Sequence, residues 1–436
     1  DPANEDIVFI GGVSLWRSMD GGQTWQLNAY WLENDSTGYI HADHHAFERH
    51  PKKSNIIYSG NDGGIARSLD GGNSWEDISH GLGIHQIYRL SQAKTDEGLI
   101  LIGNQDNGSD LYRYGSWHTV NWGDGMDNAI DPSNPNIMYS SSQRGYFYKS
   151  ENGGVSWRYI STDDIGGNGA WVTPIVIDQT NPATIYTATN RIFRSDNRGN
   201  SWSSLGTALV DENSQFRYLA VSEANPDYLY AANRSQLYFS DDRGSQWTGI
   251  TTSSLPTNVM TDIAVDPQSS TTLWITAGGY TAGQKIYRSG DRGNSWENLS
   301  GQLPNIPVNC VTVDPETAIV YIGTDLGVFY STYANSNWIA YENGLPNVII
   351  NELEIHRGAK KIRAATYGRG VWEAPLVDEP LSFQPMGISV ERKRNNSFLQ
   401  TEYVDQLQWR SNPKNSNLGN LKYKLYRLKD GNAVEI

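Results

Sequence analysis

The sequence predicts an all-β chain built around a β-propeller, and two observations carry this prediction. An eight-residue pattern, Ser-x-Asp-x-Gly-x-Thr/Ser-Trp, recurs along the chain, and its tryptophans follow one another at intervals of about 40–50 residues. The stretches between the copies contain short alternating or aromatic-aliphatic runs bounded by Gly, Asn, Asp and Pro, which are typical of antiparallel strands. A repeat of this length with strand-like content indicates a propeller or a similar array.

The recurring pattern, called the turn motif below, has a local physical role. Its Asp or Asn can accept hydrogen bonds from backbone N–H groups a few residues further on, and its glycine can take the positive φ that other residues resist. Its tryptophan opens a strand, and we expect it to be largely buried between neighbouring sheets. The motif is complete at Ser18–Trp25, Ser68–Trp75 and Ser289–Trp296, changed at one position in the copies ending at Trp157, Trp202 and Trp247, and degenerate at Trp117 and Trp338. We therefore expect a structural role for its third residues, which are Asp20, Asp70, Asn152, Asn197, Asp242 and Asp291.

Each repeat unit reads as three strands, the turn motif and a fourth strand. Seven units are complete from about residue 40 to 346, residues 1–30 add strands two to four of another unit, and residues 347–376 add strands one to three. If the two ends paired in one composite blade, the ring would have no free edge and would contain eight blades by unit count. The alternative is a seven-bladed ring whose terminal strands belong to a neighbouring propeller. We expect the propeller to span residues 1–376.

The pattern changes after a linker at 377–380. Strand-like runs at 388–392, 403–409 and 421–427 are expected to form a partial β-sandwich. The Leu407-x-Trp409 pair and the run that ends at Arg427 resemble the first half of a fibronectin type III domain. Because such a sandwich takes about 100 residues, residues 381–436 predict a truncated domain, and we expect further domains of the same protein upstream and downstream.

Composition and charge exclude several classes of function. A net charge of −14 argues against a nucleic-acid partner, because nucleic acid requires a basic face. The single cysteine, Cys310, lies in a buried-strand pattern and cannot form an internal disulfide framework. No run reaches the roughly 18 apolar residues of a membrane span. The abundance of Tyr (25) and Trp (15), with a charged fraction of 19%, fits an extracellular or cell-surface protein.

Chain topology predicts where a binding site would lie. In a four-stranded meander, the turn between strands two and three lies on the same face as the link to the next unit, and the turn motifs lie on the opposite face. Uncommon polar and aromatic residues of the first units should therefore meet at one channel mouth. The candidate ligand-binding residues are His41, Asp43, His45, Gln105, Trp122, Trp171 and Tyr367.

A metal site is the weaker interpretation of the histidines. His41, Asp43 and His45 share one side of an extended chain, and with His85 they offer nitrogen and oxygen ligands suited to a divalent ion. Histidines at the start of an inner strand can equally be hydrogen-bonded wall residues. Because no recognised spacing motif supports a metal site, we expect neither a metal nor a cofactor.

The turn motif resembles the Asp-box, or BNR repeat, of sialidases, sortilin-type receptors, xyloglucan-cleaving glycoside hydrolases and many secreted bacterial proteins. The resemblance covers residues 1–376 and implies a β-propeller, but a fold hosts many functions. In the hydrolases a catalytic carboxylate lies in an Asp-x-Gly-Gly segment. The segment Asn61-Asp62-Gly63-Gly64 resembles it, and the resemblance implies a catalytic role for Asp62. This sequence lacks the residue between Asp and Gly-Gly, and it lacks the second propeller of these relatives. The arginine triad and the Phe/Tyr-Arg-Ile-Pro opening of sialidases are not matched, since the nearest string is Asn190-Arg191-Ile192-Phe193.

Three functions stay open. The first is a binding module that presents the polar and aromatic mouth to a polysaccharide or an extracellular protein. The second is a glycoside hydrolase, for which two carboxylates must flank the bond at roughly 5–9.5 Å. Asp62, with Asp106 or Asp124 as its partner, is the candidate pair, and Asp43 and Asp127 are further carboxylates of the same region. The third is a purely structural array.

Overall fold

The computed structural model describes residues 1–32, 38–160, 165, 169–206, 209–211, 214–251, 253–256, 259–333, 335–341 and 344–377, and the backbone of four strands between 386 and 435. The described chain is built from β-strands, with one short 3₁₀ turn, η1 (Gln143–Gly145). This confirms the all-β prediction. None of the described helical segments has the length and apolar character that a membrane crossing requires.

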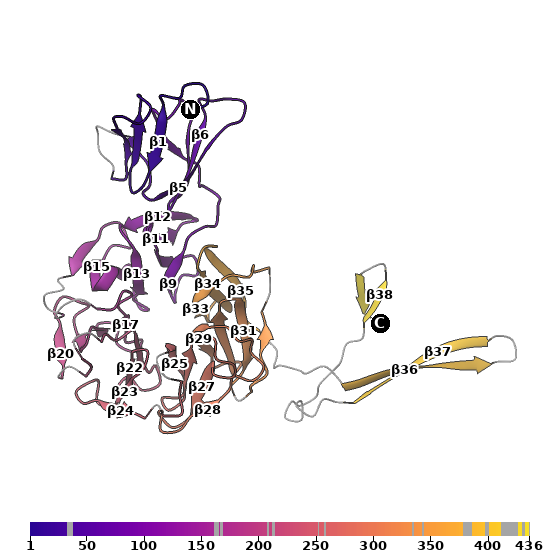
Figure 1. The fold of residues 1–436 in the computed structure, drawn as a ribbon. Coiled ribbons are helices and arrows are strands. Elements are labelled where there is room, and N and C mark those ends of the chain that lie inside the picture. Colours follow the sequence, from indigo (N-terminus) through magenta and orange to yellow (C-terminus); the bar gives the residue numbers. More distant parts are fainter. Residues whose placement is uncertain are drawn as a thin grey trace.

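Seven sheets of the described chain follow one another around a ring (Figure 1). Six are four-stranded antiparallel meanders and the seventh has three strands. The innermost strand of each sheet packs against that of the next, and β33 packs against β9, so the ring is closed. The strands are β9 (Ile87–Gln92), β10 (Ile100–Asn104), β11 (Gly108–Arg113) and β12 (Ser116–Asn121); β13 (Gly125–Ile130), β14 (Met138–Ser142), β15 (Tyr146–Ser150) and β16 (Arg158–Ile160); β17 (Ile175–Ile177), β18 (Ile185–Ala188), β19 (Ile192–Ser195) and β20 (Ser203–Leu205); β21 (Tyr218–Val221), β22 (Leu229–Ala232), β23 (Leu237–Ser240) and β24 (Thr248–Ile250); β25 (Met260–Val265), β26 (Leu273–Ala277), β27 (Ile286–Ser289) and β28 (Glu297–Asn298); β29 (Val308–Asp314), β30 (Ile319–Thr324), β31 (Gly327–Thr332) and β32 (Ile339–Ala340); and β33 (Ile350–His356), β34 (Lys361–Thr366) and β35 (Val371–Pro375).

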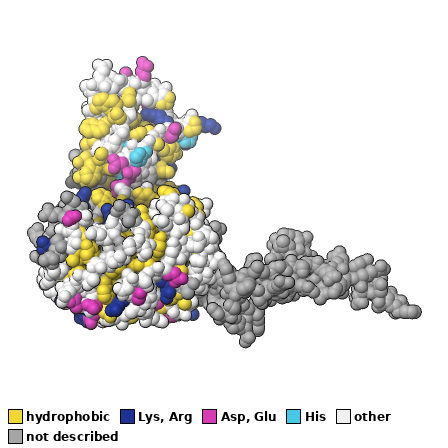
Figure 2. Space-filling model, turned by 60° about the horizontal axis from the view of Figure 1, so that its bottom comes forward, with side chains coloured by type: hydrophobic (Ala, Val, Ile, Leu, Met, Phe, Trp, Pro, Cys, Tyr) yellow, Lys and Arg dark blue, Asp and Glu magenta, His cyan; other side chains and the backbone are white. Residues whose placement is uncertain are grey.

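Two further sheets form an N-terminal unit outside the ring, above β9–β12 in Figure 1. Their strands are β1 (Val8–Gly11), β2 (Leu15–Ser18), β3 (Gln26–Tyr30) and β4 (Gly38–Tyr39), and β5 (His44–Arg49), β6 (Ile57–Asn61), β7 (Gly64–Ser68) and β8 (Glu76–Asp77). Hydrophobic side chains gather on the surface of this unit, as Figure 2 shows. Ile10, Val13, Trp16 and Met19 of this unit are exposed. The unit therefore buries less of its apolar surface than the sheets of the ring do.

The arrangement of the sheets differs from the eight-bladed count. The strands of residues 1–30 pair within the N-terminal unit, and no described sheet joins them to β33–β35. The arrangement also differs from the seven-bladed alternative, whose complete units begin at about residue 40. The described ring begins at β9, leaves β5–β8 outside and takes β33–β35 as its seventh sheet. Each end of the chain pairs with its own sequence neighbours.

The C-terminal residues are described in part. Strands β36 (Met386–Asn396) and β37 (Thr401–Arg410) form one antiparallel hairpin, and β38 (Tyr426–Lys429) and β39 (Asn432–Glu435) form another. Residues 378–380 of the linker expected at 377–380, and most of the loops of 381–436, lie outside the described residues. The fibronectin type III segment therefore stays a prediction.

The turn motif forms the hydrogen bonds that its residues predict. In the copy at Ser68–Trp75, the Asp70 carboxylate accepts from the Ser74 backbone N–H at 2.9 Å and from the Ser74 hydroxyl at 2.6 Å. The Ser68 hydroxyl accepts from the Gly72 N–H at 2.8 Å, and Gly72 has a φ of 88°. These bonds close a rigid corner between the third and fourth strands, at the opposite end of the sheet from the turn between the second and third.

The expected burial of the motif tryptophans is wrong for Trp25, whose exposed fraction is 38%. The other complete or nearly complete copies hold half-buried tryptophans, at 75, 157, 202, 247 and 296. They pack against the rims of the hydrophobic clusters between neighbouring sheets rather than inside them. Trp338, from a degenerate copy, is the deeply buried one, with 7% exposed.

Candidate functional site

The candidate site lies at the mouth of the ring, on the face opposite the turn motifs. Gln105–Asn107 join β10 to β11 there, and Trp122–Asp124 link β12 to β13. The N-terminal unit reaches the same place: the His41 ring nitrogen Nε2 lies 3.1 Å from the Asp106 carbonyl oxygen. The topology of the meander thus brings together the residues that the sequence singled out on separate units.

A chain of hydrogen bonds crosses the mouth from the third sheet of the ring to the first. The Trp171 indole N–H donates to the Tyr88 hydroxyl oxygen at 3.2 Å, and Tyr88 donates to the Gln105 side-chain carbonyl. The Gln105 amide then donates to the Asp106 carboxylate at 3.1 Å. The Asp106 backbone N–H donates to Asp124 Oδ1 at 2.8 Å. The positions of these polar groups are therefore fixed before any ligand arrives.

Asp124 is the carboxyl group of the mouth that is withdrawn from water. Its exposed fraction is 7%, and the Gln143 amide donates to its second oxygen. Burial raises the pKa of Asp124, and the neighbouring Asp106 carboxylate raises it further, while the hydrogen bonds from the Asp106 N–H and from Gln143 act in the opposite direction. Burial and the second carboxylate therefore favour the protonated form of Asp124.

The N-terminal side of the mouth is held by polar contacts of its own. The His45 Nε2 group donates to Asp62 Oδ1 at 2.6 Å, and the Asn107 amide donates to the Asp62 carbonyl at 3.0 Å. Asp43 has a φ of 60° at the bend that leads into β5. His41 and His45 have separate partners, and the described residues contain no group of three His, Cys, Asp or Glu that could hold a metal ion.

Aromatic rings leave open faces around these polar groups. Trp122 is 75% exposed, and Trp171 and Tyr367 are 40% and 37% exposed. The rings of Tyr88 and Tyr367 meet edge to face with centroids 6.4 Å apart, and the Arg144 guanidinium lies 6.0 Å from the Trp171 ring centroid. Tyr88 is the residue that sequence reasoning missed. Tyr88 lies at the start of an inner strand, the same kind of position for which the sequence analysis selected His41, so this position could have identified it.

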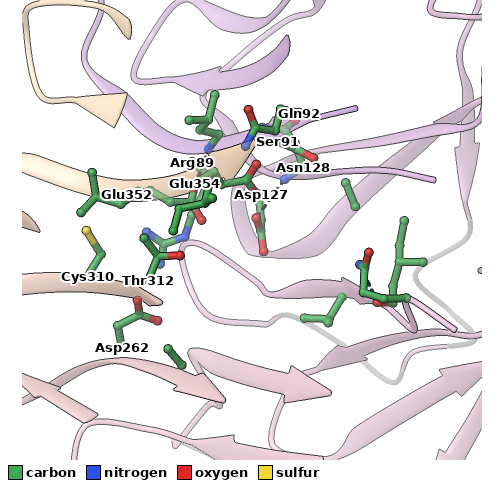
Figure 3. Close-up of a pocket in the computed structure, with 18 of the residues that line it drawn as sticks. Arg89, Ser91, Gln92, Asp127, Asn128, Asp262, Cys310, Thr312, Glu352 and Glu354 are labelled. Atoms are coloured by element: carbon green, nitrogen blue, oxygen red, sulfur yellow. Dashed lines mark hydrogen bonds between the residues drawn. The ribbon is translucent and has the colours of Figure 1, made fainter. Parts of the chain in front are cut away.

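Below the mouth, the inner strands surround a cavity of about 570 Å³, drawn in Figure 3. Asp127 lies here, because β13 has a register shift between Gly125 and Asn128. Burial raises the pKa values of Asp127 and Glu352, and it raises those of Asp262 to about 6 and Glu354 to about 8. The cavity therefore concentrates ionisable groups that the sequence analysis did not assign to the channel.

Comparisons with known proteins identify the fold. No family model matches the chain, and no curated protein matches it. Among solved structures, the chain is similar to YCF48 from Cyanidioschyzon merolae, with 14% identity over 69% of this chain and 96% of that one and a TM-score of 0.43. It is also similar to YCF48 bound to D1 peptide, with 15% identity over 68% of this chain and 94% of that one and a TM-score of 0.51. At these identities the likeness extends to the fold alone, and with the ring of antiparallel sheets it identifies the chain as a β-propeller protein.

Proposed function

We propose that the chain is a protein-binding module that takes an extended segment of a partner across the mouth of the ring. The observation that carries the proposal is the combination of a fixed hydrogen-bond chain with open aromatic faces at Trp122, Trp171 and Tyr367. Amide and carboxylate groups can pair with the backbone of a peptide, and flat rings can contact its side chains. A protein of the same fold has been solved with a bound peptide, which supports this choice of ligand.

The charge of the chain favours a basic partner. Its net charge is −14, and the mouth holds the carboxylates of Asp43, Asp62, Asp106 and Asp124. Complementary charge speeds association and selects partners more than it adds affinity. We also propose an extracellular or cell-surface setting and membership of the Asp-box proteins, which the composition and the turn motif support.

Selection from a displayed random-peptide library would test the proposal. Peptides that bind the wild-type chain should lose at least about tenfold in affinity, roughly 1.4 kcal/mol, for Trp171→Ala and for Gln105→Ala. Tyr114→Ala is the matched control, because Tyr114 is exposed but lies between β11 and β12, at the opposite end of the ring from the mouth. The proposal fails if selected peptides bind the mouth variants and the control equally well. Binding of soluble polysaccharide at the mouth, without any peptide binder, would favour the carbohydrate alternative.

A glycoside hydrolase is the second candidate, and one observation favours it. Asp124, with its raised pKa, could donate a proton. The Asp106 carboxylate interacts with Asp124 directly and is too close to flank a glycosidic bond, so the second group would have to be Asp62. Incubation with xyloglucan and β-glucans, followed by measurement of reducing ends, checks this function. We expect no release, and release that disappears in Asp124→Asn with an unchanged melting temperature would replace the binding module by the hydrolase.

A further inference from the structure

The cavity inside the ring holds charges of opposite sign that do not pair with each other. Arg89 projects from β9 into the channel, and Asp127, Asp262 and Glu352 surround it from the second, fifth and seventh sheets (Figure 3). No carboxylate oxygen of the described residues lies within 4.0 Å of its guanidinium nitrogens. Its contacts are the Tyr88 and Asn351 carbonyl oxygens, at 3.2 and 3.4 Å from Nη1. Arg89 is half-buried. An arginine withdrawn from bulk water without a carboxylate partner is uncommon, because desolvation of its charge must be compensated.

The carboxylates are held away from Arg89 by the neighbouring sheets. Asp127 Oδ2 accepts from the Ile175 N–H of β17 at 2.9 Å, and Asp262 Oδ2 accepts from the Val311 N–H of β29 at 2.9 Å. Glu352 accepts from the Leu90 N–H of β9 in the same way. Each carboxylate thus connects two inner strands, and its position is fixed by the backbone. The carboxylates cannot move to form an ion pair with Arg89 without breaking these inter-sheet hydrogen bonds.

Two other lining residues have polar atoms that lack partners. Asn128 and His356 are both more than nine-tenths buried, and Asn128 Oδ1 and His356 Nε2 have no hydrogen-bond partner. His356 Nδ1 accepts from the Ala359 N–H at 3.0 Å, so the ring proton belongs on Nε2. The cavity therefore offers an unpaired acceptor and an unpaired donor in addition to its separated charges. Such groups are costly to bury unless water or a ligand pairs with them.

An ionic contact crosses the channel at the end away from the mouth. Glu223, which follows β21 in the fourth sheet, lies 3.5 Å from Lys94 Nζ and 3.2 Å from Arg357 Nη1. Lys94 follows β9 and Arg357 follows β33, on the opposite side of the ring. All three residues line the cavity. At the mouth end, the Trp171 indole N–H donates to the Tyr88 hydroxyl oxygen. The cavity between these two contacts is called the chamber below.

We propose that this chamber binds a free amino acid, with the ligand carboxylate on Arg89 and its ammonium group between Asp262 and Glu352. A molecule with both charges can pair with groups that the fold keeps apart, whereas a simple anion would face the carboxylates and a simple cation would face Arg89. The volume of about 570 Å³ is in the usual range for small-molecule sites. A divalent ion does not fit, because the described carboxylates do not converge into a group of three ligands.

Isothermal titration of the full chain with glycine, alanine, lysine and glutamate, one at a time, tests the proposal. We expect at least one of them to bind with 1:1 stoichiometry and a Kd of about 1 mM or below. Ethylamine and propionate, which each lack one charge of alanine, should bind at least about tenfold more weakly than the best amino acid. If none of the four binds at about 10 mM, the chamber contains only water and the proposal is overturned.

Variants separate this site from the mouth. Arg89→Gln and Asp262→Asn should each weaken amino-acid binding by about tenfold or more, whereas Asp62→Asn at the mouth should leave it unchanged. If Arg89→Gln does not fold, Glu223→Gln still provides a test, since loss of the crossing ion pairs should speed ligand association without changing the contacts at Arg89. Binding that is equally strong in Asp262→Asn, or that is lost in Asp62→Asn, would contradict the placement in the chamber.

Discussion

The third residue of the turn motif can be aspartate or asparagine because its serine partner can reverse its role. The Asp70 carboxylate accepts from the Ser74 hydroxyl, whereas the Asn152 amide donates to the Ser156 hydroxyl at 2.9 Å. A hydroxyl group is both donor and acceptor, so either residue completes the corner. The hydrogen bond from the Ser74 hydroxyl is the main reason that the pKa of Asp70 falls to about 2. The sequence predicted these positions as structural because the interactions are local, within four residues.

The first serine of the motif provides a test at the residue scale. Ser289 is buried, donates to Asp291 Oδ1 and accepts from the Gly293 N–H, both at 2.8 Å. Ser289→Ala should lower the free energy of unfolding by about 1–3 kcal/mol, because it leaves a buried N–H without an acceptor. Urea denaturation measures the change, and the exposed Ser203→Ala is the control. Equal effects of the two substitutions would show that the serine has no special role in the corner.

At the scale of the element, the burial of a motif tryptophan depends on what packs against its strand. Trp338 lies within a cluster that includes Trp274 and Leu299, and its indole N–H donates to the Leu299 carbonyl at 2.8 Å. Trp25 directly precedes β3 in the N-terminal unit, where less apolar surface is buried. The motif specifies the corner, but the depth of the tryptophan is set by residues of another unit. Sequence reasoning within one repeat could not predict it.

This difference gives a prediction for two matched substitutions. Trp338→Ala should cost about 3–5 kcal/mol of unfolding free energy, because it leaves a cavity between two sheets. Trp25→Ala should cost clearly less, because much of its ring already contacts water. Chemical denaturation of both variants gives the comparison. A larger loss of unfolding free energy for Trp25→Ala than for Trp338→Ala would contradict the burial described for these two tryptophans.

The inner strands should make the stability of the ring depend on pH. Burial raises the pKa of Glu354 on β33 to about 8 and that of Asp262 on β25 to about 6, so the folded chain binds these protons more tightly than the unfolded chain does. Their contribution to stability is greatest below the pKa of an unfolded carboxyl group. It decreases as the pH rises through the folded-state pKa values of about 6 for Asp262 and about 8 for Glu354. In Glu354→Gln, melting temperatures should vary less between these pH values than in the wild type. An unchanged pH profile would contradict the burial of this group.

At the scale of the whole molecule, the period of the turn motif predicted a ring, but it could not predict how many sheets the ring contains. The choice between eight and seven blades depended on whether the two ends of the chain pair with each other, which no local pattern encodes. The same limit applies to the site. Gln105, Asp106, Asp124 and Trp171 lie close together at one mouth, whereas the bulge in β13 carries Asp127 into the channel.

Closure of the ring without a covalent link leads to the last prediction. Cys310 is the sole cysteine, so the first and last sheets must be joined by packing and hydrogen bonds. Arg363 of β34 is 2% exposed and joins the two ends: Nη1 donates to Gln92 Oε1 and Nη2 to the Glu97 carbonyl, each at 2.5 Å, while Nε donates to Glu373 at 3.2 Å. The Asn351 amide adds a bond to the Ile87 carbonyl at 2.7 Å.

Arg363→Ala removes three charge-assisted bonds at once and empties the volume of a side chain that is 2% exposed, so it should cost more than about 3 kcal/mol. Arg363→Lys can restore one of these bonds at most, so its free energy of unfolding should lie between those of Arg363→Ala and the wild type. Guanidinium denaturation followed by tryptophan fluorescence measures the loss, and hydrogen exchange shows where the ring opens, which we expect to be at β9 and β33. The exposed Lys53→Ala is the control. A loss below about 1 kcal/mol for Arg363→Ala, or exchange that begins at another pair of sheets, would mean that the ring is not closed through this residue.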